Sequence, residues 1–270
     1  MAFTLGPRAT SQGYRLAAFD KTGSTNVEAM ARAREGECGP VWFVTTEQTA
    51  GRGRRNRPWI APRGNLASSI MEVMDVAPAV AATLGFAAGL AAGTALRRVS
   101  AEAGQKAAGL SQPDFSLKWP NDVLANGMKI VGINLEAEAV GGARLAVVVG
   151  IGTNVVAAPE GMPTPAISLK ALGVDTSAEA LFAALSDSWA ECRAIWDQGK
   201  GFGEIRRRWL AFATGLGQPV AVHTGNATVS GIFDTIDDTG CMIVKTSTGE
   251  RVSISAGDVH FGAAASAGAG

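Results

Sequence analysis

Residues 115–153 constrain the fold more than any other part of the chain. They read FSLKWPNDVLANGMKIVGINLEAEAVGGARLAVVVGIGT, in which the dipeptides Asn126-Gly127 and Gly141-Gly142 separate apolar runs. Such dipeptides are typical of tight hairpin turns, because their residues accept the positive φ angles that these turns require. The pattern predicts an antiparallel meander at the centre of the chain.

Strand and helix patterns flank this meander. Thr25 and Glu28 have the spacing of a capping box at the start of the first predicted helix. The expected strands are residues 14–19, 40–47 and 65–74, and the expected helices are 24–35, 177–198 and 203–213. Together these elements predict the α+β class, with a largely antiparallel central sheet and packed helices.

Residues 76–96 carry no charge and are long enough to span a bilayer. Most of them are Ala and Gly, which favour insertion far less than Leu, Ile, Phe or Val. We therefore expect a buried helix and no membrane association. Gly85, Gly89 and Gly93 recur every four residues, which would let this helix lie close to a neighbouring helix or sheet.

The pattern changes near residue 217, after which short strands alternate with turns as far as residue 261. This spacing is typical of a small β-barrel, which at about 45 residues needs to pack on a larger domain. We expect a catalytic domain over residues 1–215, a barrel over 216–261 and a flexible tail over 262–270, where Ala and Gly predominate.

The formal net charge is zero, so the chain as a whole has no electrostatic attraction to nucleic acid or to a membrane. Its three cysteines include no Cys-x-x-Cys pair, which disfavours a zinc site or a disulfide scaffold and fits the cytoplasm. No secretory signal is visible at the N-terminus. The two histidines, His223 and His260, both lie near the C-terminus, which disfavours a Ser-His or Cys-His nucleophile.

The positive charge is local. Residues 51–65 read GRGRRNRPWIAPRGN and hold five arginines. The segment could be a solvated loop, a nucleic-acid-binding segment, or a loop that closes on a nucleotide. Gly51 and Gly53 do not complete a dinucleotide motif, because Asn56 occupies the third glycine position, and no Walker pattern is present. Arginine side chains would then bind phosphate, and Trp59 offers a face for stacking on a base.

Five short motifs occur in a fixed order: GSTN at residues 23–26, TEQTAGRGRRNRPW at 46–59, KWPND at 118–122, KIVGINLE at 129–136 and GIGTN at 150–154. Each alone fits a helix cap, a turn or a strand end. Together they resemble the biotin–protein ligase family, and the C-terminal segment resembles its SH3-like domain. Little more than twenty residues precede the first motif. We therefore expect the form without an N-terminal DNA-binding domain, and no nucleic-acid partner.

The resemblance implies an enzyme that activates biotin with ATP and Mg²⁺ to biotinyl-5′-AMP. It then transfers the biotinyl group to one lysine of a biotin carboxyl carrier domain of a biotin-dependent carboxylase. Biotin's own carboxylate is the nucleophile, so positioning and fixed positive charge suffice for the first step. The resemblance leaves a homodimer open.

The resemblance also implies roles for particular residues. The implied biotin-binding residues are Ser24, Thr25, Asn26, Gln48, Gly51, Arg52, Gly53 and Lys129. The implied nucleotide-binding residues are Arg54, Arg57, Trp59, Asn65, Lys118, Asn121 and Asn154. The implied catalytic residues are Lys129, Arg54, Lys118 and Asp122. No protein ligand for a metal is assigned, although Asp122 is a candidate through Mg²⁺, and Asp122 is also the one candidate general base for the transfer step.

Two alternatives remain. A lipoate or octanoate ligase would use a related catalytic fold and would bind lipoate in place of biotin. A non-enzymatic nucleic-acid-binding module would use the same arginines and would bind RNA or DNA in a salt-sensitive way.

Overall fold

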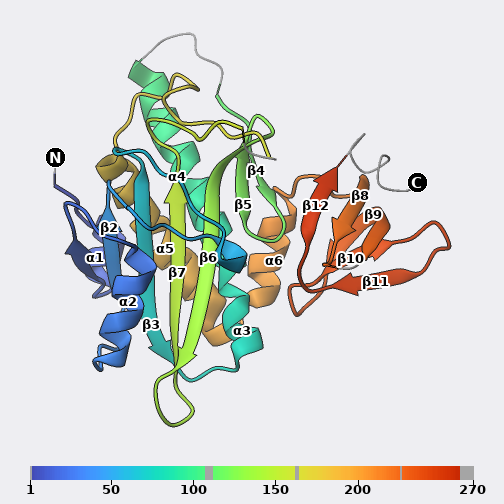
Figure 1. Cartoon of the computed structure of the whole chain (residues 1–270), viewed down its shortest axis with the longest axis horizontal. Helices are drawn as coiled ribbons and strands as arrows, with labels where there is room; N and C mark the ends of the chain where they lie inside the picture. The colour runs from blue at the N-terminus through green and yellow to red at the C-terminus, as the bar shows by residue number, and fades with distance from the viewer. Residues whose placement is uncertain (1, 107–111, 162–163, 226, 262–270) are drawn as a thin grey trace.

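The structure is a computed structural model that describes residues 2–106, 112–161, 164–225 and 227–261 (Figure 1). Its centre is the predicted meander, whose strands pair antiparallel in sequence order. These strands are β4 (Phe115–Lys118), β5 (Asp122–Ala125), β6 (Met128–Ala139) and β7 (Leu145–Thr153). Asn126 and Gly127 have φ angles of 49° and 79°, which confirms the predicted hairpin turn.

Three N-terminal strands extend the meander into a seven-stranded sheet of order β1-β2-β3-β7-β6-β5-β4. They are β1 (Arg15–Ala18), β2 (Val41–Thr45) and β3 (Leu66–Met74). β1 and β2 are parallel, and every other neighbouring pair is antiparallel. The register of β3 with β7 runs from Leu66 opposite Thr153 to Met74 opposite Leu145. This long-range pairing places the arginine-rich segment, which precedes β3, beside the end of β7.

Side-chain alternation gives the sheet two different faces. On β2, Trp42 and Val44 join the main core beneath the helices, whereas Val41 and Phe43 pack against a smaller cluster that includes Met30 of α2. Most helices therefore cover one face, and α2 (Thr25–Arg34) lies on the other. The remaining helices are α1 (Pro7–Ser11), α3 (Pro78–Ala82), α4 (Leu84–Lys106), α5 (Ala178–Trp196) and α6 (Phe202–Leu210), with short 3₁₀ turns at Arg54–Asn56 and Asp197–Gly199.

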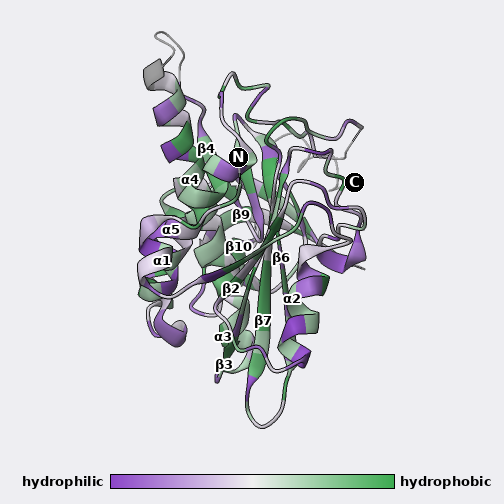
Figure 2. Ribbon diagram, turned by 90° about the vertical axis from the view of Figure 1, so that its left-hand side faces the viewer, coloured by the Kyte–Doolittle hydropathy of each residue, from purple (hydrophilic) through white to green (hydrophobic). Residues whose placement is uncertain are grey.

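The apolar helical segment Pro78–Gly104 is long and apolar enough, by length and composition, to cross a membrane, but 72% of its most apolar window is buried inside the protein. Figure 2 colours much of α4 green, as expected for an apolar helix. The predicted close approach is found at Gly89, where a Cβ would lie 3.3 Å from Trp209 Nε1. A Cβ on Gly93 would lie 3.6 Å from Leu117, which is an ordinary contact distance. Gly85 has open space around it, so no close neighbour requires a glycine there.

The predicted capping box at α2 is wrong. Ser24 is the N-cap residue, and its side chain makes no capping hydrogen bond. The Thr25 hydroxyl instead accepts a hydrogen bond from Ser69 on β3 at 2.7 Å, and Glu28 accepts one from Thr22 at 2.8 Å. The side chains of Thr25 and Glu28 therefore bond to Ser69 and Thr22, and not to the backbone N–H groups at the start of the helix.

The C-terminal strands form a five-stranded antiparallel sheet of order β11-β10-β9-β8-β12. They are β8 (Pro219–His223), β9 (Thr228–Ile236), β10 (Met242–Lys245), β11 (Arg251–Ile254) and β12 (Asp258–Phe261). Among the described residues no pairing joins β11 to β12, so the sheet is open where a closed barrel was expected. The indole of Trp119, in the β4–β5 turn, donates to Gly240 at 3.1 Å, and Arg206 of α6 donates to Ile236 at 3.0 Å. The small sheet therefore packs on the larger domain, as expected. The predicted tail lies outside the described residues.

Candidate active site

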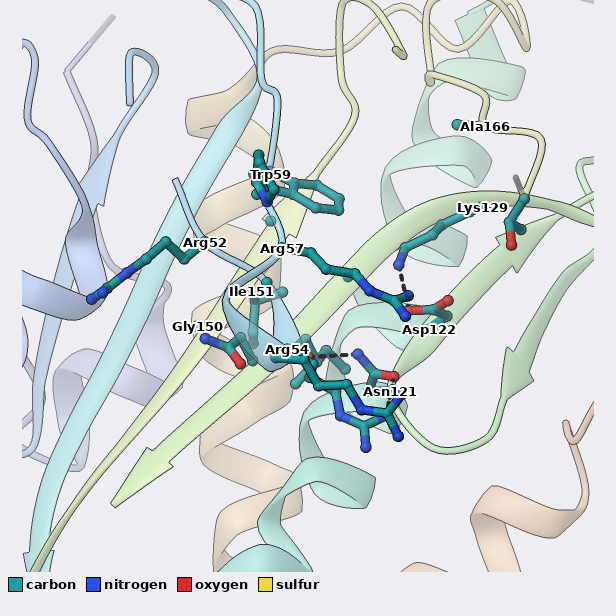
Figure 3. Close-up of a pocket in the computed structure, with 18 of the residues that line it drawn as sticks. Arg52, Arg54, Arg57, Trp59, Asn121, Asp122, Lys129, Gly150, Ile151 and Ala166 are labelled. Carbon is teal, nitrogen blue, oxygen red and sulfur yellow. Dashed lines mark hydrogen bonds and ion pairs between the residues drawn. The ribbon is translucent and has the colours of Figure 1, made fainter. Parts of the chain in front are cut away.

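A cavity of about 520 Å³ opens on the face of the large sheet that carries α2. Its walls are the start of α2, the arginine-rich segment, the β4–β5 turn, strands β6 and β7, and the start of β12 (Figure 3). Most of the predicted site residues line it: Ser24, Thr25, Asn26, Gln48, Arg52, Gly53, Arg54, Arg57, Trp59, Lys118, Asn121, Asp122, Lys129 and Asn154. Folding thus brings all five sequence motifs to one cavity.

One end of the cavity is a buried polar cluster at the N-terminus of α2. Gln48 accepts a hydrogen bond from the backbone N–H of Thr25 at 2.9 Å. Ser69 donates to Thr25 and to Asn26 Oδ1, at 2.7 and 2.6 Å. Hydroxyl and amide groups at a helix N-terminus suit a neutral polar ligand head, because they offer both donors and acceptors.

An ion pair lies at the middle of the cavity. The Lys129 ammonium is 2.6 Å from Asp122 Oδ1, and the two side chains are only 25% and 15% exposed. Figure 3 shows both side chains at the cavity wall. A cation in this position can neutralise an entering anion.

Arg54 reaches across the cavity from the arginine-rich segment. Its guanidinium donates to Asn121 Oδ1 at 3.1 Å, and Asn121 Nδ2 donates to the Ile133 carbonyl at 2.8 Å, which fixes the orientation of the amide. Burial, followed by repulsion from Arg55, lowers the pKa of Arg54. Burial also lowers the pKa of Lys118. Both cations have lost hydration, so a bound anion would stabilise them strongly.

Cations outnumber carboxylates among the described lining residues. The lining cations are Arg52, Arg54, Arg55, Arg57, Lys118 and Lys129. The carboxylates are Asp122 and Asp258. This local excess of positive charge on a neutral protein suits an anionic ligand. The volume of the cavity suits a ligand of drug-like size.

Comparison with known proteins gives these features a context. Residues 19–154 match the biotin/lipoate A/B protein ligase family, and residues 215–262 match the biotin protein ligase C-terminal domain. The chain belongs to the biotin/lipoate A/B protein ligase family. It is 40% identical over 248 residues to a biotin–[acetyl-CoA-carboxylase] ligase from Paracoccus denitrificans, covering 90% of this chain and 98% of that protein.

Two further relatives agree with this family assignment. A biotin–[acetyl-CoA-carboxylase] ligase from Mycobacterium tuberculosis is 35% identical over 244 residues, which cover 88% of this chain and 86% of that protein. The biotin protein ligase from Aquifex aeolicus, solved in complex with biotin and ATP, has the same fold. Its TM-score is 0.73 at 23% identity, and the alignment covers 92% of this chain and 99% of that one.

In this member of the ligase family, Trp59 lies flat on a floor of strand glycines. A Cβ on Gly132 would come within 2.6 Å of Trp59 Cζ3, and one on Gly152 within 2.6 Å of Cε2. The sequence analysis missed both glycines as site residues. Their signal was present, because glycine inside a strand often marks a close approach by another group.

Two predicted residues of this ligase-family chain, Asn65 and Gly51, lie outside the cavity lining. Asn65 Oδ1 accepts from the backbone N–H groups of residues 155–157 at 2.9–3.2 Å, and Asn65 Nδ2 donates to Ala157 at 2.8 Å. Asn65 therefore holds the segment after β7, and its contact with adenine stays a prediction. A Cβ on Gly51 would lie 2.7 Å from the Trp59 carbonyl, so this glycine lets the segment fold back on itself.

Other residues at or beside the cavity were not predicted as site residues. Glu136 lies behind the lining and accepts from two lining residues, Asn26 at 2.9 Å and Asn134 at 3.0 Å. Ala166 follows Pro165, whose carbonyl accepts from the backbone N–H of Lys129 at 2.8 Å and so helps to fix that residue. Asp258 comes from the C-terminal sheet, more than two hundred residues from the arginines that it contacts.

Proposed function

We propose that this chain is a biotin–protein ligase. It activates biotin with ATP to biotinyl-5′-AMP, and then transfers the biotinyl group to a lysine of a biotin carboxyl carrier domain. The observation that carries the proposal is the arrangement of Lys129, Arg54 and Lys118 around one cavity that has a neutral polar end at α2. Membership of the ligase family and the named relatives support it.

In the first step a carboxylate oxygen of biotin attacks the α-phosphorus of ATP. A new P–O bond forms, and the bond from the α-phosphorus to the bridging oxygen breaks to release pyrophosphate. The main obstacle is the approach of two anions, so a fixed cation between them lowers the barrier. Lys129 is proposed for this role, because its side chain lines the cavity and its ammonium lies 2.6 Å from Asp122.

The polar end at α2 suits biotin's ureido group, which has two N–H donors and one carbonyl acceptor. Thr25 and Gln48 are proposed to contact it together with Ser24, because their hydroxyl and amide groups already form one network there. Arg52 and Gly53 are proposed to close over the ring, and Asn26 to shape the deepest part of the cavity. The carboxylate tail would then point towards Lys129.

The other end of the cavity suits ATP. Arg54, Arg57 and Lys118 are proposed to bind phosphate, and Trp59 and Asn154, which also line the cavity, are proposed to contact the nucleoside. Asn154 Oδ1 is buried without a hydrogen-bond partner among the described residues, so it has an acceptor to offer. Asn121 is proposed to act through Arg54, whose guanidinium it accepts at 3.1 Å.

Mg²⁺ is proposed to enter with ATP. Among the described residues no group of three or more His, Cys, Asp or Glu side chains could hold a metal alone. Asp122, whose Oδ1 lies 2.6 Å from the Lys129 ammonium, is nevertheless a lining carboxylate that could share the ion with several phosphate oxygens. Bound there, Mg²⁺ would offset the charge of the phosphates.

In the second step the amine of the carrier lysine attacks the acyl carbon, and AMP leaves as the amide forms. The amine loses a proton, and Asp122 is the carboxylate nearest to Lys129 that could accept it.

We propose residues 1–215 as the catalytic domain and 216–261 as the C-terminal domain. We also propose a cytoplasmic location, since all three cysteines are free thiols.

The proposal is tested by incubating the protein with a purified carrier domain, ATP, Mg²⁺ and either biotin or lipoate. We expect intact-mass spectrometry to show one biotinyl group on the wild-type carrier, and none on a carrier whose target lysine is replaced by arginine. Transfer of lipoate in preference to biotin would favour the related lipoate ligases. Transfer of neither acid would overturn the proposal.

A further inference from the structure

The first residue of β12 links the C-terminal sheet to the arginine-rich segment. We propose that Asp258 is a positioning residue that tethers residues 53–57, here called the arginine turn, over the cavity and so slows the escape of biotinyl-AMP. The release part of this inference rests on the proposed function, whereas the tether itself does not.

The contacts are ion pairs from two arginines to one carboxylate. Arg57 Nη2 lies 2.8 Å from Asp258 Oδ2, and Arg57 Nη1 lies 3.5 Å from Oδ1. Arg55 Nη1 lies 3.3 Å from Oδ2. Hydrogen bonding from Arg57 is the largest cause of the lowered pKa of Asp258, so this carboxyl is ionised at neutral pH. One side chain of the C-terminal sheet therefore contacts two arginines of the turn, Arg55 and Arg57.

Few other contacts hold the arginine turn. Arg54 donates to Asn121 Oδ1 at 3.1 Å, and the backbone of the turn contributes a hydrogen bond from Gly53 to Arg57 at 2.8 Å and one from Arg57 to Arg54 at 3.2 Å. Arg55 and Asn56 have φ angles of 55° and 58°, a left-handed conformation that disfavours residues other than glycine. Such a turn persists only where its surroundings hold it, which is what the contacts with Asp258 provide.

The charge balance points the same way. Arg54, Arg55 and Arg57 stand close enough for Arg55 and Arg57 each to lower the pKa of Arg54, whereas Asp258 raises it. Asp122 also raises it, but that carboxylate is already paired with Lys129 at 2.6 Å. Among the described lining residues, Asp258 is therefore the carboxylate available to offset the repulsion within the turn.

The anchor itself is fixed to the fold. Asp258 lies opposite His223 in the antiparallel pair of β12 and β8, and the next residue, Val259, is buried. The Asp258 side chain is 44% exposed, so a substitution there should leave the sheet folded. Because the pairs are exposed, each one contributes modestly, and the expected effects are several-fold rather than complete.

A competing interpretation makes the opposite prediction. If Asp258 occupied the arginines in place of phosphate, its removal would free them and strengthen ATP binding. If Asp258 is a tether, its removal loosens the turn and weakens retention of the adenylate. The direction of the change therefore separates the two.

The experiment compares Asp258→Asn with Asp234→Asn, a matched control. Asp234 is also a partly exposed aspartate of the C-terminal sheet, 2.7 Å from Arg251 and away from the cavity. The first measurement is the rate of thermolysin cleavage in residues 53–60 of the ligand-free protein. The second is the rate at which preformed biotinyl-AMP leaves the protein. We expect Asp258→Asn to raise both rates about three- to tenfold, and Asp234→Asn to change neither.

A second variant guards against an indirect effect. Arg55→Gln removes the other partner of one pair, and its effect on cleavage should not add to that of Asp258→Asn. Asp258→Glu should recover most of the wild-type behaviour. An unchanged rate of cleavage in Asp258→Asn, or a higher affinity of this variant for ATP, would show that Asp258 is not a tether. The cleavage measurement contains no biotin or ATP, so it judges the tether even if the wild-type protein fails to make biotinyl-AMP and the proposed function falls.

Discussion

Trp59 rests on Gly152 so closely that a Cβ at residue 152 would lie 2.6 Å from the indole nitrogen. That nitrogen is buried and has no hydrogen-bond partner among the described residues. The indole therefore covers the part of the cavity floor where β6 and β7 carry no side chain. A ligand that enters must either stack on this indole or displace it.

Gly152→Ala should lower both ATP use and stability. The added methyl group would push Trp59 off its floor, and overpacking of this kind costs about 1–3 kcal/mol of folding stability. Displacement of the indole should also lower kcat/KM for ATP by roughly tenfold. The control is Gly203→Ala in α6, where an added Cβ meets nothing within 4 Å. Steady-state kinetics and thermal unfolding of both variants would check this, and normal kinetics in Gly152→Ala would contradict the role of the glycine floor.

Lys129→Ala should nearly abolish adenylate formation while the protein stays folded. Its ammonium is the cation held at 2.6 Å from Asp122, and loss of a preorganised charge of this kind costs roughly a hundredfold or more in rate. Lys200→Ala is the control, because Lys200 is 78% exposed and distant from the cavity. Release of pyrophosphate in the presence of biotin measures the step, and a near-normal rate in Lys129→Ala would argue against the assignment.

Arg54→Gly should loosen retention of the intermediate. The variant loses the hydrogen bond to Asn121 at 3.1 Å that links the arginine turn to the β4–β5 turn. We expect about a tenfold faster release of biotinyl-AMP, since changes of this kind act mainly on dissociation. Arg63→Gly is a control on the same segment, 83% exposed and outside the cavity lining. Equal rates of biotinyl-AMP release from both variants would show that Arg54 does not help the arginine turn to retain the intermediate.

Lys118 should give ATP binding an alkaline limit. Burial lowers its pKa below the usual 10.5, so the ammonium present at neutral pH is lost at a lower pH than that of an exposed lysine. KM for ATP should therefore rise as pH increases towards 10. Lys118→Arg keeps its charge throughout this range and should flatten the rise. Identical alkaline profiles for the two proteins would show that Lys118 does not bind phosphate.

Local sequence patterns predicted the elements of the fold better than their arrangement. Turn dipeptides such as Asn126-Gly127 specify a hairpin through their own φ angles, so the meander could be read directly. The partnership of β3 with β7 joins Leu66 to Thr153 and depends on packing across the whole domain. The capping box failed for the same reason, because Ser69, more than forty residues away, bonds to Thr25.

The residues of the candidate site also fall into those that local sequence motifs predict and those that only the tertiary fold brings together. Motif order identified Lys129, Arg54 and the other predicted lining residues, because each motif is a short segment of the sequence. Asp258 could not be found, since nothing in the sequence of β12 distinguishes it from other exposed aspartates. Asn65 illustrates a third case, in which the position was noticed but three backbone N–H groups occupy its side-chain oxygen.

We propose that cationic side chains on the arginine turn and the large sheet bring the carboxylate of biotin to the α-phosphate of ATP without a protein nucleophile. Biotin-dependent exchange of labelled pyrophosphate into ATP measures this step alone. We predict exchange that requires biotin, proceeds without a carrier domain and is lost in Lys129→Ala. Exchange that proceeds equally well without biotin, or no exchange by the wild-type protein, would show that these side chains do not activate biotin.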